Sequence, residues 1–163
     1  MSEDWKLPAH RLLERMGIPW ERRVFPALTP KGAASVAAAL GFRASQMVKT
    51  LIFQSGTGER ALVAVGGDRN AISGRLKKAF GNRNIRLAAP DAVFKFTGYR
   101  IGSIPPFGWQ PEGARTFIDE ALMEEPLLGV GAGVWGEEIL ITPTNLVRAT
   151  GGIVFNLTRR PPP

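Results

Sequence analysis

The sequence predicts a single α+β domain with a mixed, barrel-like β-sheet flanked by helices. Segments with the apolar spacing of helices alternate irregularly with short runs rich in β-branched and aromatic residues. No internal repeat or low-complexity linker divides the 163 residues, of which 44% are hydrophobic and 21% charged, a composition typical of globular domains. We therefore expect one domain over residues 1–158 and a frayed tail at 159–163.

Glycine, threonine and proline mark the ends of the predicted helices. Gly17, Gly41 and Gly81 each follow a segment of helical spacing, where a left-handed residue commonly closes a helix. Thr142 followed by Pro143 is a typical helix start, because threonine caps the first turn and proline fits into it. The predicted helices are Pro8–Met16, Ala33–Leu40, Asn70–Phe80, Pro90–Phe96 and 143–149.

The predicted strands are short and carry β-branched or aromatic residues at most positions. The run that begins at Arg60 is continuously apolar after that residue, which is typical of the centre of a sheet. Residues 55–58 have the composition of a turn between this run and the preceding one. The predicted strands are Trp20–Phe25, Met47–Gln54, Arg60–Val65, Thr116–Ile118, Leu127–Val130, Glu138–Thr142 and Ile153–Leu157.

The positive charge is concentrated in the middle third of the chain. The net charge is +7; residues 60–100 hold nine Lys or Arg against two Asp, whereas residues 101–163 hold four basic and seven acidic residues. Contact with a phosphate backbone requires such a concentration, although a solvated helix face gives the same pattern. The candidate nucleic-acid contacts are Arg69, Arg75, Lys77, Lys78, Arg83 and Arg86.

Lys49 lies in a predicted strand whose faces are both mainly apolar, so the strand is expected to be covered on both sides. With period two it shares one face with Leu51 and Phe53, while Val48 and Thr50 belong to the other. A lysine in this position either extends to solvent or occupies a cleft where its charge meets a partner. Lys49 is therefore the first candidate catalytic residue.

Several common catalytic motifs are absent or incomplete. The chain has no cysteine, which excludes disulfides, thiolate metal sites and cysteine nucleophiles. The single histidine, His10, has no ligand partner at a suitable spacing, so we expect a surface residue, no metal and no serine–histidine triad. The glycines at 129–133 resemble a dinucleotide fingerprint, but no helix follows them and no cofactor is implied. The pairs Glu124-Glu125 and Glu137-Glu138 are expected to mark turns.

The chain shows no sign of a membrane segment or a secretory signal. No apolar run approaches the ~18 residues that span a bilayer, and the acidic first residues lack an apolar core. A cytoplasmic protein with no membrane partner is the default expectation.

The loop from Thr97 to Gly108 combines glycines with two adjacent prolines. Such a loop can hold several main-chain N–H groups pointing the same way, as an oxyanion site demands, although a rigid turn is the simpler interpretation. Ser103 and Ile104 retain N–H groups that are free to donate, whereas Pro105 has none.

Several of these segments, taken in order, resemble the YbaK/ProX (EbsC) family of trans-editing aminoacyl-tRNA deacylases. This family is related to the editing domain inserted in bacterial prolyl-tRNA synthetases. The resemblance covers residues 5 to 158 and is carried by five motifs rather than by a single signature. They are Met47–Leu51, Gly66-Gly67-Asp68, Thr97-Gly98-Tyr99 with Gly102-x-x-x-Pro106-Phe107-Gly108, Phe117–Glu120 and Gly131-Ala132-Gly133.

The resemblance implies roles for individual residues. Lys49 matches the family's essential lysine, and Gly102 with Pro106 matches the loop whose backbone amides hold the scissile aminoacyl group. Gly131 lies in the turn that is close to the terminal adenosine, and Asp119 matches an acidic position without an assigned role. Further candidate substrate-binding residues are Thr97, Gly98, Ser103, Ile104 and Phe107, of which Thr97, Ile104 and Phe107 are expected to form pocket walls.

The resemblance implies hydrolysis of an aminoacyl ester at the tRNA acceptor end, with a small residue such as Ala or Cys on a prolyl-type tRNA. An aminoacyl-tRNA synthetase is the further partner that it suggests. Many members read Gly-Gly-x-Ser-Pro in the loop, whereas this chain has Ser103 and Pro105, which alters the pocket lining. Two alternatives remain open: a non-catalytic RNA- or nucleotide-binding module, and a small-molecule acyl-ester hydrolase.

Overall fold

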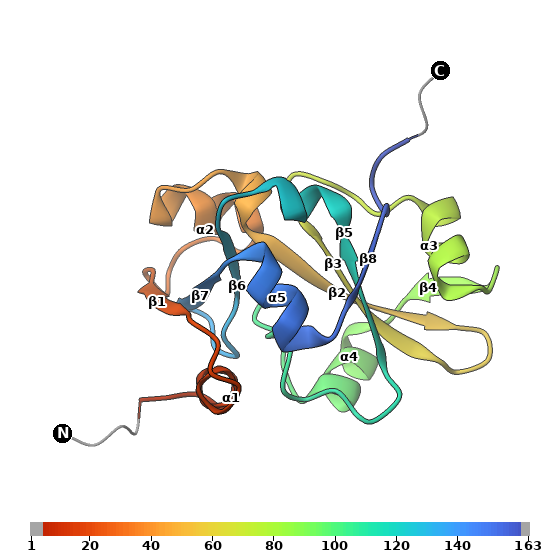
Figure 1. Ribbon diagram of the computed structural model, residues 1–163, viewed down its shortest axis with the longest axis horizontal. Coiled ribbons are helices and arrows are strands. Elements are labelled where there is room, and N and C mark those ends of the chain that lie inside the picture. Colours follow the sequence, from red (N-terminus) through yellow and green to blue (C-terminus); the bar gives the residue numbers. More distant parts are fainter. Residues whose placement is uncertain (1–4, 161–163) are drawn as a thin grey trace.

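The computed structural model describes residues 5–160 as two β-sheets with helices around them (Figure 1). The helices are α1 Pro8–Arg15, α2 Ala33–Leu40, α3 Ser73–Phe80, α4 Pro90–Thr97 and α5 Pro143–Thr150, with 3-10 helices η1 Ala44–Gln46 and η2 Glu120–Glu124. The strands are β1 Glu21–Val24, β2 Val48–Ser55, β3 Arg60–Gly66, β4 Ile85–Leu87, β5 Arg115–Asp119, β6 Leu128–Gly131, β7 Glu137–Ile141 and β8 Ile153–Phe155.

The larger sheet is mixed, as predicted. Its order is β4-β2-β3-β5-β8, with antiparallel pairing around β2 and parallel pairing of β3 with β5 and of β5 with β8. The smaller sheet, β1-β7-β6, is antiparallel. The barrel-like sheet does not close: in the described chain β4 and β8 remain separate edges of an open sheet. Both edges are only three residues long, so neither offers a ladder that could close the sheet.

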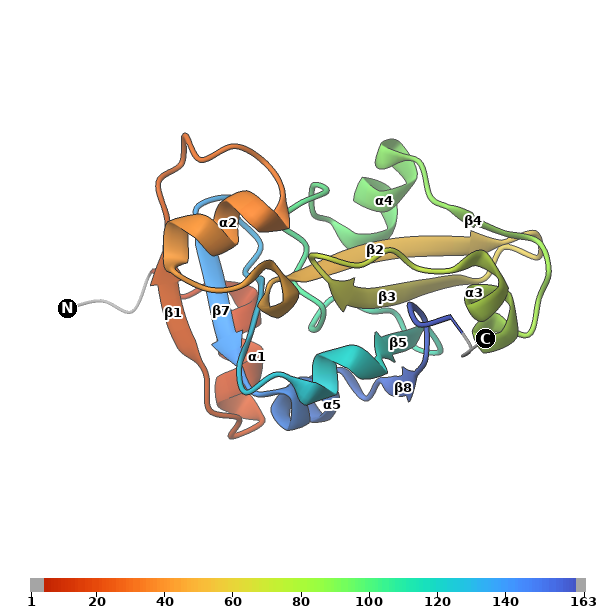
Figure 2. The ribbon, with the colours of Figure 1, turned by 90° about the horizontal axis from the view of Figure 1, so that it is seen from above.

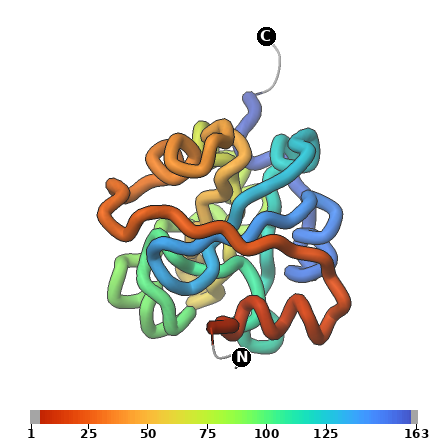
Figure 3. Tube along the Cα trace, turned by 90° about the vertical axis from the view of Figure 1, so that its left-hand side faces the viewer, coloured from red at the N-terminus to blue at the C-terminus, as the bar shows by residue number. Residues whose placement is uncertain are grey.

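β2 and β3 are the longest strands of the described chain and pair as a hairpin. Figure 2 shows α2 and β7 at one end of this hairpin and α3 and β4 at the other, with α4 and α5 on opposite sides of it. Seen from the first end, the segment with β1 passes across the β6–β7 hairpin with which it pairs (Figure 3). The long hairpin therefore joins the small sheet to the basic α3–β4 end.

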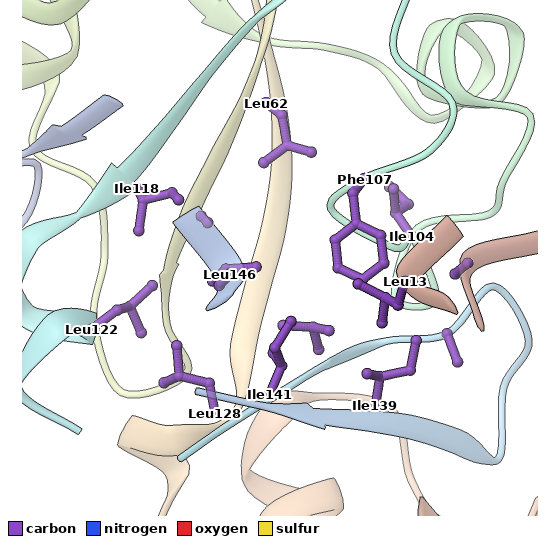
Figure 4. Packing of buried hydrophobic residues seen from close by; sticks show 14 of the residues in the cluster. Leu13, Leu62, Ile104, Phe107, Ile118, Leu122, Leu128, Ile139, Ile141 and Leu146 are labelled. Carbon is purple, nitrogen blue, oxygen red and sulfur yellow. The ribbon is translucent and has the colours of Figure 1, made fainter. Parts of the chain in front are cut away.

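The main hydrophobic core lies between the two sheets. Leu62, Ile118, Leu146 and Ile139 are all buried in it, and Figure 4 shows Phe107 next to Leu13 in the same cluster. A second cluster between β3 and α3 covers the other face of the hairpin. The alternating faces of β3 enter both clusters, which explains why its sequence is apolar throughout.

Most predicted elements are found within a few residues of their expected bounds, but β4 and both 3-10 helices were not predicted. The expected helix start at Asn70 is wrong, because α3 begins only at Ser73. His10, expected at the surface, is fully buried and stacks on Trp20 with ring centroids 4.5 Å apart. Its Nδ1 accepts a hydrogen bond from the N–H of Leu7, and burial lowers the pKa of His10.

Candidate functional site

A cavity of about 200 Å³ lies beside the first half of β2. This stretch borders a gap in the sheet, because β4 pairs only with Phe53–Ser55 and the bridge to β6 lies at Met47, just before β2. The walls come from α2, β2, the loop after α4 and the β6–β7 hairpin. They are Gly32, Ala33, Val36, Met47, Val48, Lys49, Thr50, Leu51, Ile101, Gly102, Ile104, Gly131, Trp135 and Glu138.

Lys49 is the one basic residue among these walls. Its Nζ lies 3.4 Å from the side-chain oxygen of Asn70, a neutral partner at the start of the α3 segment. Lys49 is half-buried and takes part in none of the ion pairs found between residues 5 and 160. Its ammonium therefore has no carboxylate within 4 Å in the described chain.

The loop after α4 begins with a tight turn that requires glycine. The N–H of Ser103 donates to the carbonyl oxygen of Arg100 over 3.2 Å, and Gly102, the third residue of this turn, has φ +96°. The expectation that the Ser103 N–H is free is therefore wrong. By contrast, no hydrogen bond within residues 5–160 uses the N–H of Gly102 or of Ile104, so two cavity residues keep free main-chain donors.

Hydrogen bonds and close packing hold this loop in place. The indole of Trp109 donates to the carbonyl oxygen of Pro105 and the Gln110 amide to that of Pro106, both at 2.6 Å. Gly131 lies directly against the loop, because a Cβ at this position would be 2.7 Å from the carbonyl oxygen of Ile104. The two free donors thus belong to a rigid part of the cavity wall.

Glu138 is the acidic residue of the cavity, and sequence reasoning missed it. It lies in β7 opposite Gly131, and burial raises its pKa to about 8. The expectation that Glu137-Glu138 marks a turn is wrong for this residue. Period two places Glu138 on the same face as buried Leu140, a signal that was available in the sequence. The hydroxyl of Thr50 was also missed; it is buried without a partner among the described residues.

The residues around the cavity also match a known protein family. The family described as "Aminoacyl-tRNA editing domain" matches residues 30–149, which include every wall of the cavity. The chain belongs to this family. The match confirms the predicted resemblance and, with it, the predicted class of enzyme, an aminoacyl-tRNA deacylase.

Individual relatives agree with this assignment. The editing domain is 24% identical over 156 residues to the "Putative Cys-tRNA(Pro)/Cys-tRNA(Cys) deacylase EbsC" of Enterococcus faecalis, covering 95% of this chain and 94% of that protein. A solved "putative trans-editing enzyme for prolyl tRNA synthetase" superimposes with a TM-score of 0.83 at 29% identity, covering 98% of this chain and 99% of the other.

A second group of relatives is much longer than this chain. The editing domain is 32% identical over 92 residues to the proline--tRNA ligase of Pelobacter propionicus. The match covers 56% of this chain but only 16% of that ligase. The similarity is therefore to one part of the larger enzyme.

Four of the predicted catalytic and substrate-binding residues line the cavity of the editing domain: Lys49, Gly102, Ile104 and Gly131. Thr97 and Phe107, expected as pocket walls, do not. The Thr97 hydroxyl is buried and bonds to the carbonyl oxygen of Val93, closing α4, while Phe107 packs in the core. Gly98, Ser103 and Pro106 also lie outside the cavity lining. Gly98 has φ +80° and ends α4.

Asp119 of the editing domain lies away from the cavity. It is fully buried at the end of β5, where its carboxylate accepts hydrogen bonds from the N–H of Leu157 at 2.9 Å and the hydroxyl of Thr158 at 2.6 Å. Beyond them, Arg159 pairs with Glu124. Residues 161–163 of the predicted tail lie outside the described part. Asp119 thus fastens the last segment of the chain to the sheet.

The predicted nucleic-acid residues fall into two groups. Lys77, Lys78, Arg83 and Arg86 are exposed at the α3–β4 end. Arg69 and Arg75 are half-buried, and their side chains bond to Thr158 and to the backbone of Arg159. Asn70, the partner of Lys49, lies between β3 and α3.

No helix within residues 5–160 is long and apolar enough to cross a membrane. Among the same residues, no three His, Asp or Glu side chains lie close enough to hold a metal ion.

Proposed function

We propose that this protein removes a small, wrongly attached amino acid from a tRNA of the prolyl type by hydrolysing the aminoacyl ester. The observation that carries the proposal is that Lys49 and the free N–H groups of Gly102 and Ile104 belong to the walls of one cavity. The name of EbsC supports the tRNA type and cysteine as the amino acid, and the names of the proline--tRNA ligases support the tRNA type.

The proposed chemistry needs no protein nucleophile, because an aminoacyl ester is already activated. Water adds to the ester carbonyl carbon, and the N–H groups of Gly102 and Ile104 stabilise the resulting oxyanion. Each preorganised donor of this kind is worth roughly 10²–10³ in rate. The intermediate then breaks its bond to the ribose oxygen, which leaves with a proton and frees the amino acid. The neighbouring ribose hydroxyl is our proposed activator of the water.

Lys49 acts in this scheme as a cation. Its only hydrogen-bond partner in the described chain is an amide oxygen, so the ammonium is available for a phosphate or for the ester carbonyl. A nucleic-acid end also brings negative charge, which a cation attracts. The alternative, a neutral lysine acting as base, requires an environment that favours the uncharged amine.

Selectivity is proposed to come from the size of the cavity. At about 200 Å³ it lies below the roughly 300–1,000 Å³ of sites for drug-sized ligands, so it favours short side chains. Glu138 adds one carboxyl group to this space, which can form a hydrogen bond with the substrate's α-amino group. The exposed basic face at α3–β4 is proposed to hold acceptor-stem phosphates. A synthetase partner is proposed from the relatives' names alone.

The test is a deacylation assay with alanyl-, cysteinyl-, seryl- and threonyl-tRNA(Pro). We expect the wild-type protein to hydrolyse the alanyl or cysteinyl ester and Lys49→Ala to lose at least ~100-fold in rate, the value of one strong electrostatic contact. Lys49→Arg, which keeps the charge but cannot act as a base, retains measurable activity. Arg15→Ala, an exposed site on α1, is the matched control and keeps full activity.

The possible outcomes separate the alternatives. Inactivity of the wild-type protein on all four esters, with tRNA binding intact, favours a non-catalytic RNA-binding module. Loss of activity in Lys49→Arg equal to that in Lys49→Ala contradicts the cation role. Equal rates on a tRNA ester and on a simple amino-acid ester favour a small-molecule esterase.

A further inference from the structure

A second, larger cavity adjoins the first. Its volume is about 370 Å³, and it lies between α4 and the start of the loop that carries Gly102. It is lined by Pro90, Asp91, Phe94, Lys95, Arg100 and Ile101. Ile101 also lines the first cavity, so one side chain forms part of both walls. The two cavities are therefore neighbours at Ile101.

The chemistry of this second cavity is that of a single-stranded nucleic-acid site. Phe94 is 50% exposed, although a phenylalanine normally packs inside. The guanidinium of Arg100 lies 5.6 Å from the centre of its ring, and Lys95 is its exposed neighbour on α4. An exposed aromatic ring flanked by cations provides a surface for base stacking together with charge for a phosphate.

The charges of the cavity favour a nucleotide over an apolar protein segment. Lys95 and Arg100 take part in none of the ion pairs found in residues 5–160, so both charges are available. Asp91 is the single opposing charge, and it lies at the exposed start of α4. A carboxylate there suits the exocyclic amino group of cytosine, from which aspartate and glutamate accept hydrogen bonds in other complexes. The two nucleotides before the terminal adenosine of the tRNA CCA end are both cytidines.

We propose that this second cavity binds an unpaired nucleotide just upstream of the terminal adenosine, with its base stacked on Phe94 and its phosphate held by Lys95 and Arg100. The assignment rests on the proposed function, since it takes the ester to lie in the first cavity. Consecutive nucleotides must occupy adjoining sites, and the shared wall at Ile101 meets this requirement. The cavity would thus position the acceptor end for hydrolysis.

The test compares Phe94→Ala with Phe94→Trp on two substrates that carry the same amino acid: mischarged tRNA and the aminoacyl ester of adenosine alone. We expect Phe94→Ala to lower kcat/KM on the tRNA about 5- to 150-fold, the usual effect of losing one stacked base, and to leave the adenosine ester unchanged. Phe94→Trp keeps both activities. Ile153→Ala, which shortens an equally exposed apolar side chain on β8, serves as control and changes neither.

A second measurement does not depend on catalysis. Fluorescence anisotropy of a labelled oligoribonucleotide ending in CCA should show weaker binding to Phe94→Ala than to the wild type. An oligonucleotide ending in UUA should bind the wild-type protein less tightly, because its uracils lack the amino group. Circular dichroism checks that each variant is folded.

The results distinguish this proposal from the proposed function. If Lys49→Ala loses activity while Phe94→Ala matches the wild type in both assays, the second-cavity proposal is wrong and the proposed function stands. An equal loss on both substrates, without a loss of oligonucleotide binding, means that Phe94 only supports the Gly102 loop. If no ester is hydrolysed but Phe94→Ala weakens oligonucleotide binding, the proposed function is wrong and the nucleotide site stands.

Discussion

Gly131 packs directly against the carbonyl group of Ile104, and this contact joins the β6–β7 hairpin to the loop that carries the proposed oxyanion donors. An added Cβ would lie 2.7 Å from that oxygen and 3.0 Å from backbone atoms of Ser103. Because the neighbours are backbone rather than flexible side chain, the loop itself must move to admit a methyl group. The contact therefore leads to a specific prediction.

We predict that Gly131→Ala lowers the rate of deacylation by about 10- to 100-fold, since displacing a catalytic group by about 1 Å has an effect of this size. The accompanying loss of stability is about 1–3 kcal/mol, the usual effect of overpacking. A tRNA deacylation assay measures the rate, and urea unfolding measures the stability. Gly74→Ala is the control, because a Cβ there meets nothing within 4 Å. A fully active Gly131→Ala protein would contradict the donor role of this loop.

The pKa of Glu138 predicts how stability depends on pH. Burial raises this pKa from 4.5 to about 8, so the folded state binds a proton that the unfolded state releases. The stabilisation is complete below pH 4.5 and is lost as the pH rises to about 8, with a slope of at most ~1.4 kcal/mol per pH unit. Glu138→Gln should remove this slope. Urea denaturation of both proteins between pH 4.5 and 9 gives the free energy of unfolding at each pH. If the two plots of this free energy against pH were parallel, the prediction for Glu138 would be wrong.

Asp119 is predicted to stabilise the fold without acting on the substrate. Asp119→Ala leaves the buried N–H of Leu157 without an acceptor, which costs about 1–3 kcal/mol of unfolding free energy. Asp119→Asn keeps one acceptor oxygen and should lose less. The deacylation rate per folded molecule should change less than about threefold, well below the effect of losing one oxyanion donor. A large drop in the deacylation rate of a fully folded Asp119→Asn protein would contradict this prediction and show that Asp119 acts on the substrate.

The exposed basic face predicts a dependence on salt. Replacing Lys77 and Lys78 by alanine should weaken the binding of tRNA whatever its sequence. It should also reduce the slope of the logarithm of the binding constant against the logarithm of the salt concentration by about one per lost phosphate contact. Hydrolysis of the aminoacyl ester of adenosine should stay the same, because this short substrate does not reach α3. Filter binding at several salt concentrations provides the measurement. An unchanged slope would exclude these two lysines from the interface.

Local patterns in the sequence predicted most of the elements and the side chains that need no distant partner. The cap of α5 is an example: Thr142 accepts a hydrogen bond from the N–H of Asn145, as its position before Pro143 indicates. Lys49 stood out because a charged residue interrupted an apolar strand. The family resemblance rested on short motifs and their order along the chain, and both can be recognised in the sequence without the structure.

Only the tertiary structure decided which groups meet and which donors stay free. His10 has an ordinary surface pattern, yet packing against Trp20 buries it completely. Glu138 becomes a cavity residue because β7 pairs with β6 and places it opposite Gly131. Ser103 loses its free N–H to a turn with Arg100, a matter of backbone dihedral angles. Burial and hydrogen bonding depend on segments that are far apart in the chain, and a local pattern does not contain that information.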